Sequence, residues 1–143
     1  MEELTQELKV CLASVFSLYL KAHNFHWNVE GPFFSQYHEL FKTIYEDVWD
    51  SVDAIAEHLR TLGAYAPGSL SRFSELTVVS DQINIPSANK MIQELLQDNE
   101  NVKQQLIKAF RLAESNNPGV SNFLQGRIEM HEKHSWMLRA TGK

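Results

Sequence analysis

The chain has 143 residues, of which 43% are hydrophobic and 22% charged, with a single cysteine and a formal net charge of -5. This length fits one domain over residues 1–143, and the lone Cys11 excludes a disulfide framework and favours a reducing, cytoplasmic setting. The acidic first residues are not typical of a secretory signal, and no apolar run reaches membrane-spanning length, so we expect no membrane partner. The negative charge argues against a general affinity for nucleic-acid backbones.

Two long amphipathic patterns occupy the first half of the chain. Apolar residues from Leu4 to Ala22 recur in steps of three and four, which predicts a helix from about residue 3 to about residue 28 that stops at Gly31-Pro32. A second period runs from Phe33 to Leu62 and ends at Gly63, a natural C-terminal cap. Because the connection between these helices is short, we expect them to be antiparallel neighbours.

The second half contains a long connection and two more helices. Residues 63–86 are too many for a simple turn and include one short predicted helix around Leu70, Phe73 and Leu76. A long helix follows the N-cap Ser87 and ends near residues 116–119, where Pro118 begins the last helix. The long connection can return along the second helix, so that the second and third long helices run parallel. The sequence therefore predicts an all-α four-helix bundle with a short extra helix in one long crossover.

Four residues are candidate metal ligands: His26, His38, Asp53 and Glu57. Asp53 and Glu57 are four residues apart and share a helix face, as a carboxylate clamp would, although such pairs are also common on solvated faces. Fifteen residues separate His38 from Asp53, roughly 22 Å of helical rise, so one chain cannot bring both to one metal ion. His26 and His38 should meet at the turn between their helices. An antiparallel two-fold pairing of the second helix would then complete two sites at once.

The ligand types restrict the metal. A mixed histidine and carboxylate shell suits ferrous iron and leaves positions open for an oxidant, and zinc would also fit. None of the six histidines has Asp or Glu three residues before it, so the Glu-x-x-His pattern of a di-iron centre within a bundle is missing. A metal site inside the single-chain core is therefore disfavoured.

Three other residues of the first two helices have simpler interpretations. Trp27 and Trp49 are expected to pack in the core or in a dimer, with a smaller role as electron donors or radical traps near a redox metal. Cys11 lies on the apolar face of the first helix and is expected to be an inert core residue.

Two further polar groups are interpreted as structural. His131 and His134 have the spacing of a chelating pair, but we expect them to complement the dipole near the end of the last helix. An acidic run on the second helix is expected to form a solvated face, or in a hollow assembly to line the interior and collect iron; it comprises Glu46, Asp47 and Asp50.

Three segments carry a family resemblance: LKAHNFHWNVEGPFFSQYHELF, VDAIAEHLRTLGAYAPGSL and HEKHSWMLRA. They resemble the Dps family of DNA-protection-during-starvation proteins, or mini-ferritins, over almost the whole chain. The most specific feature is the combination of His-Trp-Asn-Val-x-Gly, a second histidine twelve residues after the first, and Asp-x-x-x-Glu fifteen residues further on.

The resemblance implies a ferritin-like four-helix bundle that assembles into a hollow homo-dodecamer. It also implies ferroxidase centres at the two-fold interfaces, with His26 and His38 from one subunit and Asp53 and Glu57 from its partner. In this family Fe(II) is oxidised, with hydrogen peroxide as the preferred oxidant, and ferric mineral is stored inside. Iron would then be the bound metal, with zinc as a competing ion, and hydroxyl-radical formation would be suppressed.

The chain departs from the family pattern at three places. Lys42 stands four residues after His38, where many members carry an acid, which puts a second iron position in question. His58 replaces the usual Arg after the clamp glutamate. The N-terminal residues are acidic rather than Lys-rich, so DNA binding is expected to be absent or weak. Two alternatives remain at this point: a non-enzymatic DNA-compacting protein of the same fold, and a helical interaction module whose histidines and acids are structural.

Overall fold

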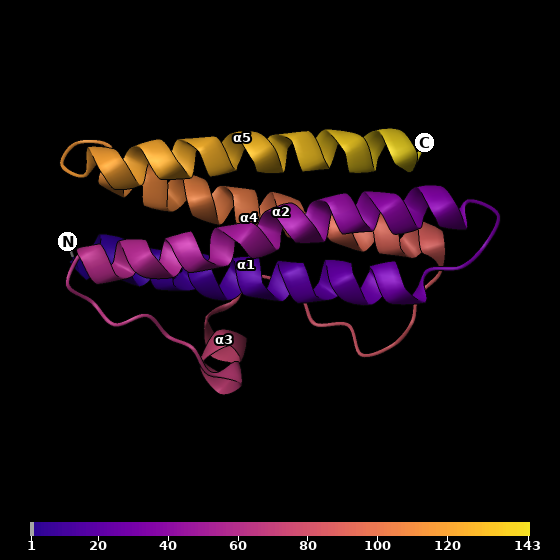
Figure 1. The fold of residues 1–143 in the computed structure, drawn as a ribbon, viewed down its shortest axis with the longest axis horizontal. Coiled ribbons are helices and arrows are strands. Elements are labelled where there is room, and N and C mark those ends of the chain that lie inside the picture. The colour runs from indigo at the N-terminus through magenta and orange to yellow at the C-terminus, as the bar shows by residue number, and fades with distance from the viewer. Residues whose placement is uncertain (1) are drawn as a thin grey trace.

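A computed structural model describes residues 2–143 as five helices with no strand among them. The helices are α1 (Glu2–Asn28), α2 (Phe34–Thr61), α3 (Leu70–Leu76), α4 (Ala88–Ala113) and α5 (Pro118–Thr141). Figure 1 shows α1 and α2 as one antiparallel pair and α4 and α5 as another, and the long crossover returns along the bundle so that α2 and α4 run parallel. The predicted four-helix bundle with a short extra helix is confirmed.

Local residue chemistry sets the helix ends. The side chains of Ser69 and Ser87 accept hydrogen bonds from the third backbone N–H of the helices that follow them, which satisfies donors left free at each N-terminus. Gly63 ends α2 with φ of 85° and Gly31 lies in the α1–α2 turn with φ of 128°, a region that favours glycine. Pro118 begins α5, where its missing N–H removes no helical hydrogen bond.

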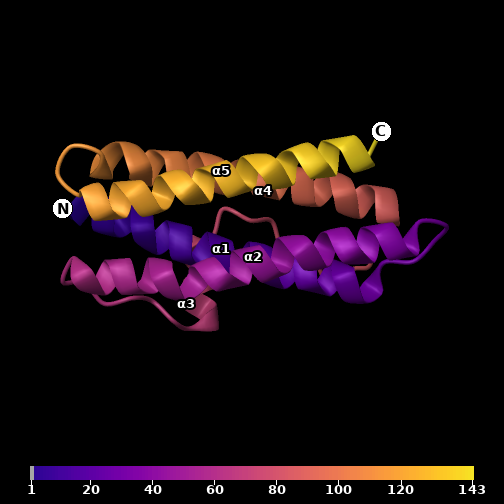
Figure 2. The same ribbon diagram turned by 45° about the horizontal axis from the view of Figure 1, so that its top comes forward.

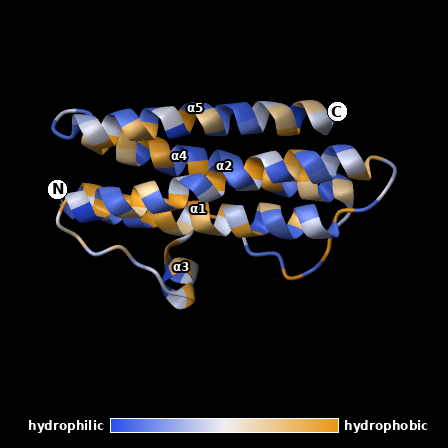
Figure 3. Ribbon diagram, viewed as in Figure 1, coloured by the Kyte–Doolittle hydropathy of each residue, from blue (hydrophilic) through white to orange (hydrophobic). Residues whose placement is uncertain are grey.

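One continuous apolar core fills the space between the four long helices. Each long helix contributes buried residues at helical spacing, and Figure 3 shows apolar and polar positions alternating around them. Phe25, Phe41 and Met91 are among the largest side chains that are fully buried. Cys11 is also fully buried, so its predicted core position is confirmed, and burial raises the pKa of its thiol to about 12.

The crossover between α2 and α4 is fixed to the bundle rather than loose. Helix α3 packs on the outer side of α1, away from α4 and α5, in both Figure 1 and Figure 2. Beyond it, the backbone N–H of Val78 donates to Ser14 Oγ, and the N–H of Ser80 donates to Asp98 Oδ1. The buried Lys21 ammonium of α1 links this connection to α4, since it donates to the Ser80 carbonyl at 2.8 Å and pairs with Asp98 at 2.6 Å.

Candidate functional site

The α1–α2 turn brings His26 and His38 together in a symmetric arrangement. His26 Nδ1 lies 2.8 Å from the backbone carbonyl oxygen of His38, and His38 Nδ1 lies 2.8 Å from the carbonyl oxygen of His26. The two rings stack with centroids 3.7 Å apart and planes 15° from parallel. His26 is buried and His38 half-buried, so packing between α1 and α2 holds both rings in place.

These reciprocal hydrogen bonds determine which nitrogen of each ring can bind a metal. A carbonyl oxygen only accepts, so each Nδ1 must carry a hydrogen and donate it. In the neutral ring the other nitrogen, Nε2, is then unprotonated and has a free lone pair. A backbone carbonyl that orients a histidine in this way is the usual support for a metal-binding imidazole. The pair is therefore prepared to present two Nε2 donors without any further rearrangement.

The predicted carboxylate ligands lie on α2, away from the histidine pair. Asp53 and Glu57 are exposed on α2, and neither carboxylate forms a hydrogen bond or ion pair with the other described residues, 2–143. Fifteen residues of α2 separate Asp53 from His38, which corresponds to roughly 22 Å along the axis. No group of three or more His, Cys, Asp or Glu residues within residues 2–143 could hold a metal ion. A single chain thus presents two separate half-sites, and their joining by a partner stays a prediction.

A buried polar network, which the sequence interpretation missed, crosses the middle of the bundle. Arg127 on α5 donates to both carboxylate oxygens of Asp47 on α2, at 2.9 and 2.8 Å, and His134 Nε2 lies 2.7 Å from Asp47 Oδ2. His131 Nε2 lies 3.1 Å from an Arg127 nitrogen, and its Nδ1 lies 2.7 Å from Asn99 Oδ1 on α4. Because Arg127 can only donate, His131 accepts at Nε2 and donates from Nδ1 to Asn99. The network joins α2, α4 and α5.

The network corrects two expectations. Asp47 is not part of a solvated acidic face: burial alone would raise the pKa of its carboxyl, but hydrogen bonds from His134 and Arg127 hold that pKa well below its ordinary value. His131 does not supply positive charge to a helix end, because burial, and then the Arg127 charge, lower its pKa well below 6.5 and keep it neutral. His134 is also buried and pairs with Asp47 instead of facing the helix end.

The residue spacing on α5 contained the signal for this network. Seven of its residues are buried, and five of these follow one another in steps of three and four: Leu124, Arg127, His131, His134 and Leu138. Three polar residues in the middle of a core stripe require partners from the facing helices, because an unpaired buried charge or donor is costly. That requirement predicts a polar network, although it does not say which residues of α2 and α4 complete it.

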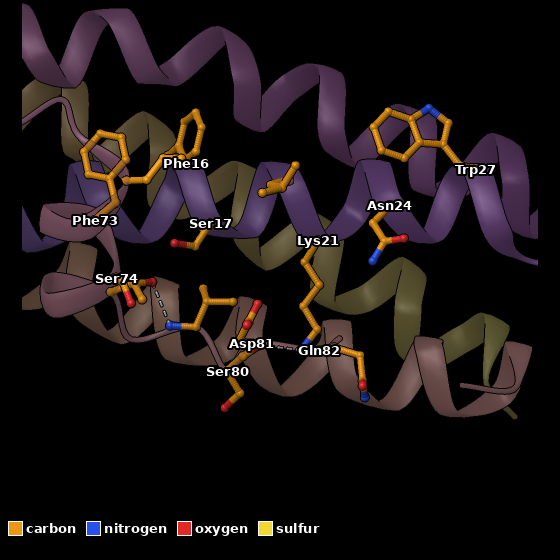
Figure 4. A pocket seen from close by; sticks show the side chains of 14 residues that line it. Phe16, Ser17, Lys21, Asn24, Trp27, Phe73, Ser74, Ser80, Asp81 and Gln82 are labelled. Carbon is orange, nitrogen blue, oxygen red and sulfur yellow. Dashed lines mark hydrogen bonds between the residues drawn. The ribbon is translucent and has the colours of Figure 1, made fainter. Parts of the chain in front are cut away.

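One groove lies on the outer side of α1 and lacks the side chains of a metal site. It has a volume of about 600 Å³ and lies between α1, α3 and the segment 77–82. Figure 4 shows Trp27 at one end, Phe16 and Phe73 at the other, and Lys21 reaching across toward the segment 80–82. Its lining includes one carboxylate, Asp81, and no histidine.

The two tryptophans near the half-sites do not belong to the core. Trp27 is 58% exposed and Trp49 is 50% exposed, so the expectation of core packing within one chain is wrong for both. Packing of these indoles in a dimer remains a prediction.

Between residues 2 and 143, no helix is both long and apolar enough to span a lipid bilayer.

Comparison with known proteins places this geometry in a family. The model of the ferritin-like domain matches residues 5–142. The chain is 32% identical over 124 residues to DNA protection during starvation protein 2 of Bacillus anthracis, covering 86% of this chain and 85% of that one. It is 38% identical over 136 residues to a low temperature-induced protein of Nostoc sp., covering 90% and 74% of the two chains.

Solved structures agree with the sequence relatives. The crystal structure of Dps from Staphylococcus aureus superposes with a TM-score of 0.94 at 30% identity and covers 100% of this chain and 97% of that one. Dps from Vibrio cholerae, described as a member of a broad superfamily of ferritin-like diiron-carboxylate proteins, has a TM-score of 0.93 at 27% identity, covering 99% and 90%. The chain therefore belongs to the Dps family of ferritin-like proteins.

Proposed function

We propose that this protein stores and detoxifies iron in the cytoplasm by oxidising Fe(II) at centres shared between two subunits. One observation carries this proposal: hydrogen bonds at Nδ1 of both His26 and His38 leave two adjacent Nε2 donors. The carboxylates of Asp53 and Glu57 are exposed on α2, the helix that also carries His38. Membership of a family that includes a diiron-carboxylate protein supports iron as the substrate.

Assembly of the site requires a second chain. If two α2 helices pair antiparallel about a two-fold axis, the histidine pair of one subunit faces Asp53 and Glu57 of the partner subunit, and the same operation makes a second, identical site. Two imidazoles and two carboxylates form a mixed nitrogen and oxygen shell that accepts ferrous iron and leaves positions open. We propose hydrogen peroxide as the preferred oxidant, with ferric mineral stored in a hollow dodecamer.

Single substitutions test the site. We expect His26→Ala and Asp53→Ala each to abolish rapid oxidation of Fe(II) by peroxide, because each removes a donor from every site of the assembly. Asp50→Ala is the matched control, since Asp50 is an exposed acid on α2 outside the ligand set. Wild-type rates in either ligand variant would refute the assignment. Size-exclusion chromatography tests the assembly, for which twelve chains of 16.5 kDa give about 198 kDa.

The rival function is DNA compaction without redox chemistry, which the description of several relatives as DNA protection proteins brings forward. Here the first turn of α1 contains Glu2 and Glu3, whose carboxylates repel a phosphate backbone. We therefore expect no gel shift of duplex DNA at physiological salt. A strong shift that weakens with added salt would favour the rival.

A further inference from the structure

The residue that follows His38 on its helix face bears on how many iron ions, and so how many electrons, the proposed site can provide. Lys42 lies one helical turn after His38 on α2 and pairs with Glu46 at 3.8 Å, so a cation, not a carboxylate, follows this histidine on its helix face. A site with one ferrous ion supplies one electron, whereas reduction of hydrogen peroxide to two waters consumes two. If iron alone reacts, one electron cleaves the O–O bond to give water and a hydroxyl radical, which the proposed function must avoid.

Aromatic rings continue from the histidine pair along α1 and α2. The Tyr45 ring lies 5.2 Å from the His26 ring, edge to face, and stacks on the His23 ring with centroids 3.9 Å apart and planes 11° from parallel. The Tyr19 ring lies 6.1 Å from Tyr45 and 5.5 Å from His23. Rings in contact therefore connect His26 to Tyr19 without a gap.

Tyr19 differs from the other three tyrosines in having a base beside its hydroxyl. Its Oη lies 3.1 Å from His23 Nδ1. Oxidation of a phenol releases the phenolic proton, and a neutral imidazole in hydrogen-bond contact can take it. Tyr19 and His23 are both half-buried, and they border an open cleft of about 530 Å³ that also includes Glu46 and Asp50. The pair is thus held in place by α1 and, in the single chain, borders this cleft.

We propose that Tyr19, hydrogen-bonded to His23, supplies the second electron for peroxide reduction through the ring contacts of Tyr45 and His26. This proposal rests on the proposed ferroxidase function. Fe(II), the Tyr19 phenol, neutral His23, hydrogen peroxide and two protons give Fe(III), the Tyr19 phenoxyl radical, protonated His23 and two waters: iron and phenol are each oxidised by one electron, and the O–O bond breaks. The phenolic proton passes to His23 Nδ1. A second Fe(II) then reduces the radical, which takes a proton back and restores the phenol.

Electron paramagnetic resonance of rapidly frozen samples tests this step. The full assembly is loaded with one Fe(II) per subunit and mixed with one equivalent of peroxide, and a tyrosyl doublet is expected whose splitting collapses when tyrosine is deuterated at its β-methylene. We expect loss of this signal in Tyr19→Phe, which keeps the ring, and in His23→Phe, which removes the base. Tyr65→Phe is the matched control, because Tyr65 is 82% exposed and lies after α2. The amount of hydroxyl radical caught by a spin trap should increase in Tyr19→Phe but not in Tyr65→Phe.

The outcomes separate this inference from the function on which it rests. If the unmodified protein oxidises iron with peroxide and forms no organic radical, the electron-donor role of Tyr19 is refuted and the ferroxidase stands. A radical that persists in Tyr19→Phe, or that is insensitive to tyrosine deuteration as a Trp49 or Trp27 radical would be, also refutes it. Absence of iron oxidation in the unmodified protein refutes both.

Discussion

The proposed sharing of each site between two subunits makes a quantitative prediction about mixed assemblies. One variant, His26→Ala with His38→Ala, lacks the nitrogen donors, and a second, Asp53→Ala with Glu57→Ala, lacks the carboxylates. Neither variant alone can form an intact site, whichever subunits provide the ligands. We expect co-expression of the two with different affinity tags to give cages of the proposed kind that contain both kinds of subunit.

The expected activity of such cages follows from the two-fold geometry. In a random equal mixture, half of the interfaces pair unlike subunits. Each of those interfaces has one site with all four ligands intact and one site with none. About one quarter of the sites are therefore restored, and the fraction falls as the mixture departs from equal proportions. If all four ligands came from one chain, no mixture would restore any site.

The assay measures the initial rate of Fe(II) oxidation by peroxide in cages purified through both tags. Cages of each variant alone, and a mixture of preassembled variant cages, serve as controls and should be inactive. Size-exclusion chromatography checks that all of them assemble to the same size. Mixed cages that are as inactive as the separate variants would refute the shared site, provided that both kinds of subunit are present.

Three further predictions concern the core. Asp47→Asn leaves Arg127 buried without its anion, so we expect the free energy of unfolding to fall by about 3 kcal/mol in urea denaturation, with Asp50→Asn unchanged. The pKa of His131 lies well below 6.5 in the folded state, so the unfolded chain binds the extra proton, and stability should decrease as the pH falls below about 6.5; an unfolding midpoint that is flat from about pH 7 to pH 5 would contradict this. The Cys11 thiol should not react with a thiol reagent at neutral pH until denaturant is added, when one thiol per chain should appear.

Most of the fold was predictable because it depends on local signals. The steps of three and four between apolar residues give the long helices, and Gly63, Ser87 and Pro118 mark three of their ends by backbone chemistry that acts over a few residues. The length of the segment between Gly63 and Ser87 was enough to predict that α2 and α4 run parallel. The same reasoning from helical rise showed that His38 and Asp53 could not share a metal within one chain.

The pairing of polar side chains across the bundle was not predictable in this way. Asp47 belongs to an acidic run with Glu46 and Asp50, and helical spacing alone does not show that it turns toward Arg127 and His134. His131 likewise has a spacing that suits either a chelating pair or a helix end. Burial decides between these alternatives, because it removes water as a partner and makes the facing helix supply the hydrogen bonds.

The sequence by itself determined the all-α architecture, the family and the separation of the candidate ligands His26 and His38 from Asp53 and Glu57, because each depends on spacing along the chain. Only the tertiary structure showed that His26 and His38 fix each other's tautomer across the α1–α2 turn and that Tyr19 meets His23 beside them. Those contacts depend on the relative placement and rotation of whole helices. That placement results from the packing of the entire core, which no local pattern contains.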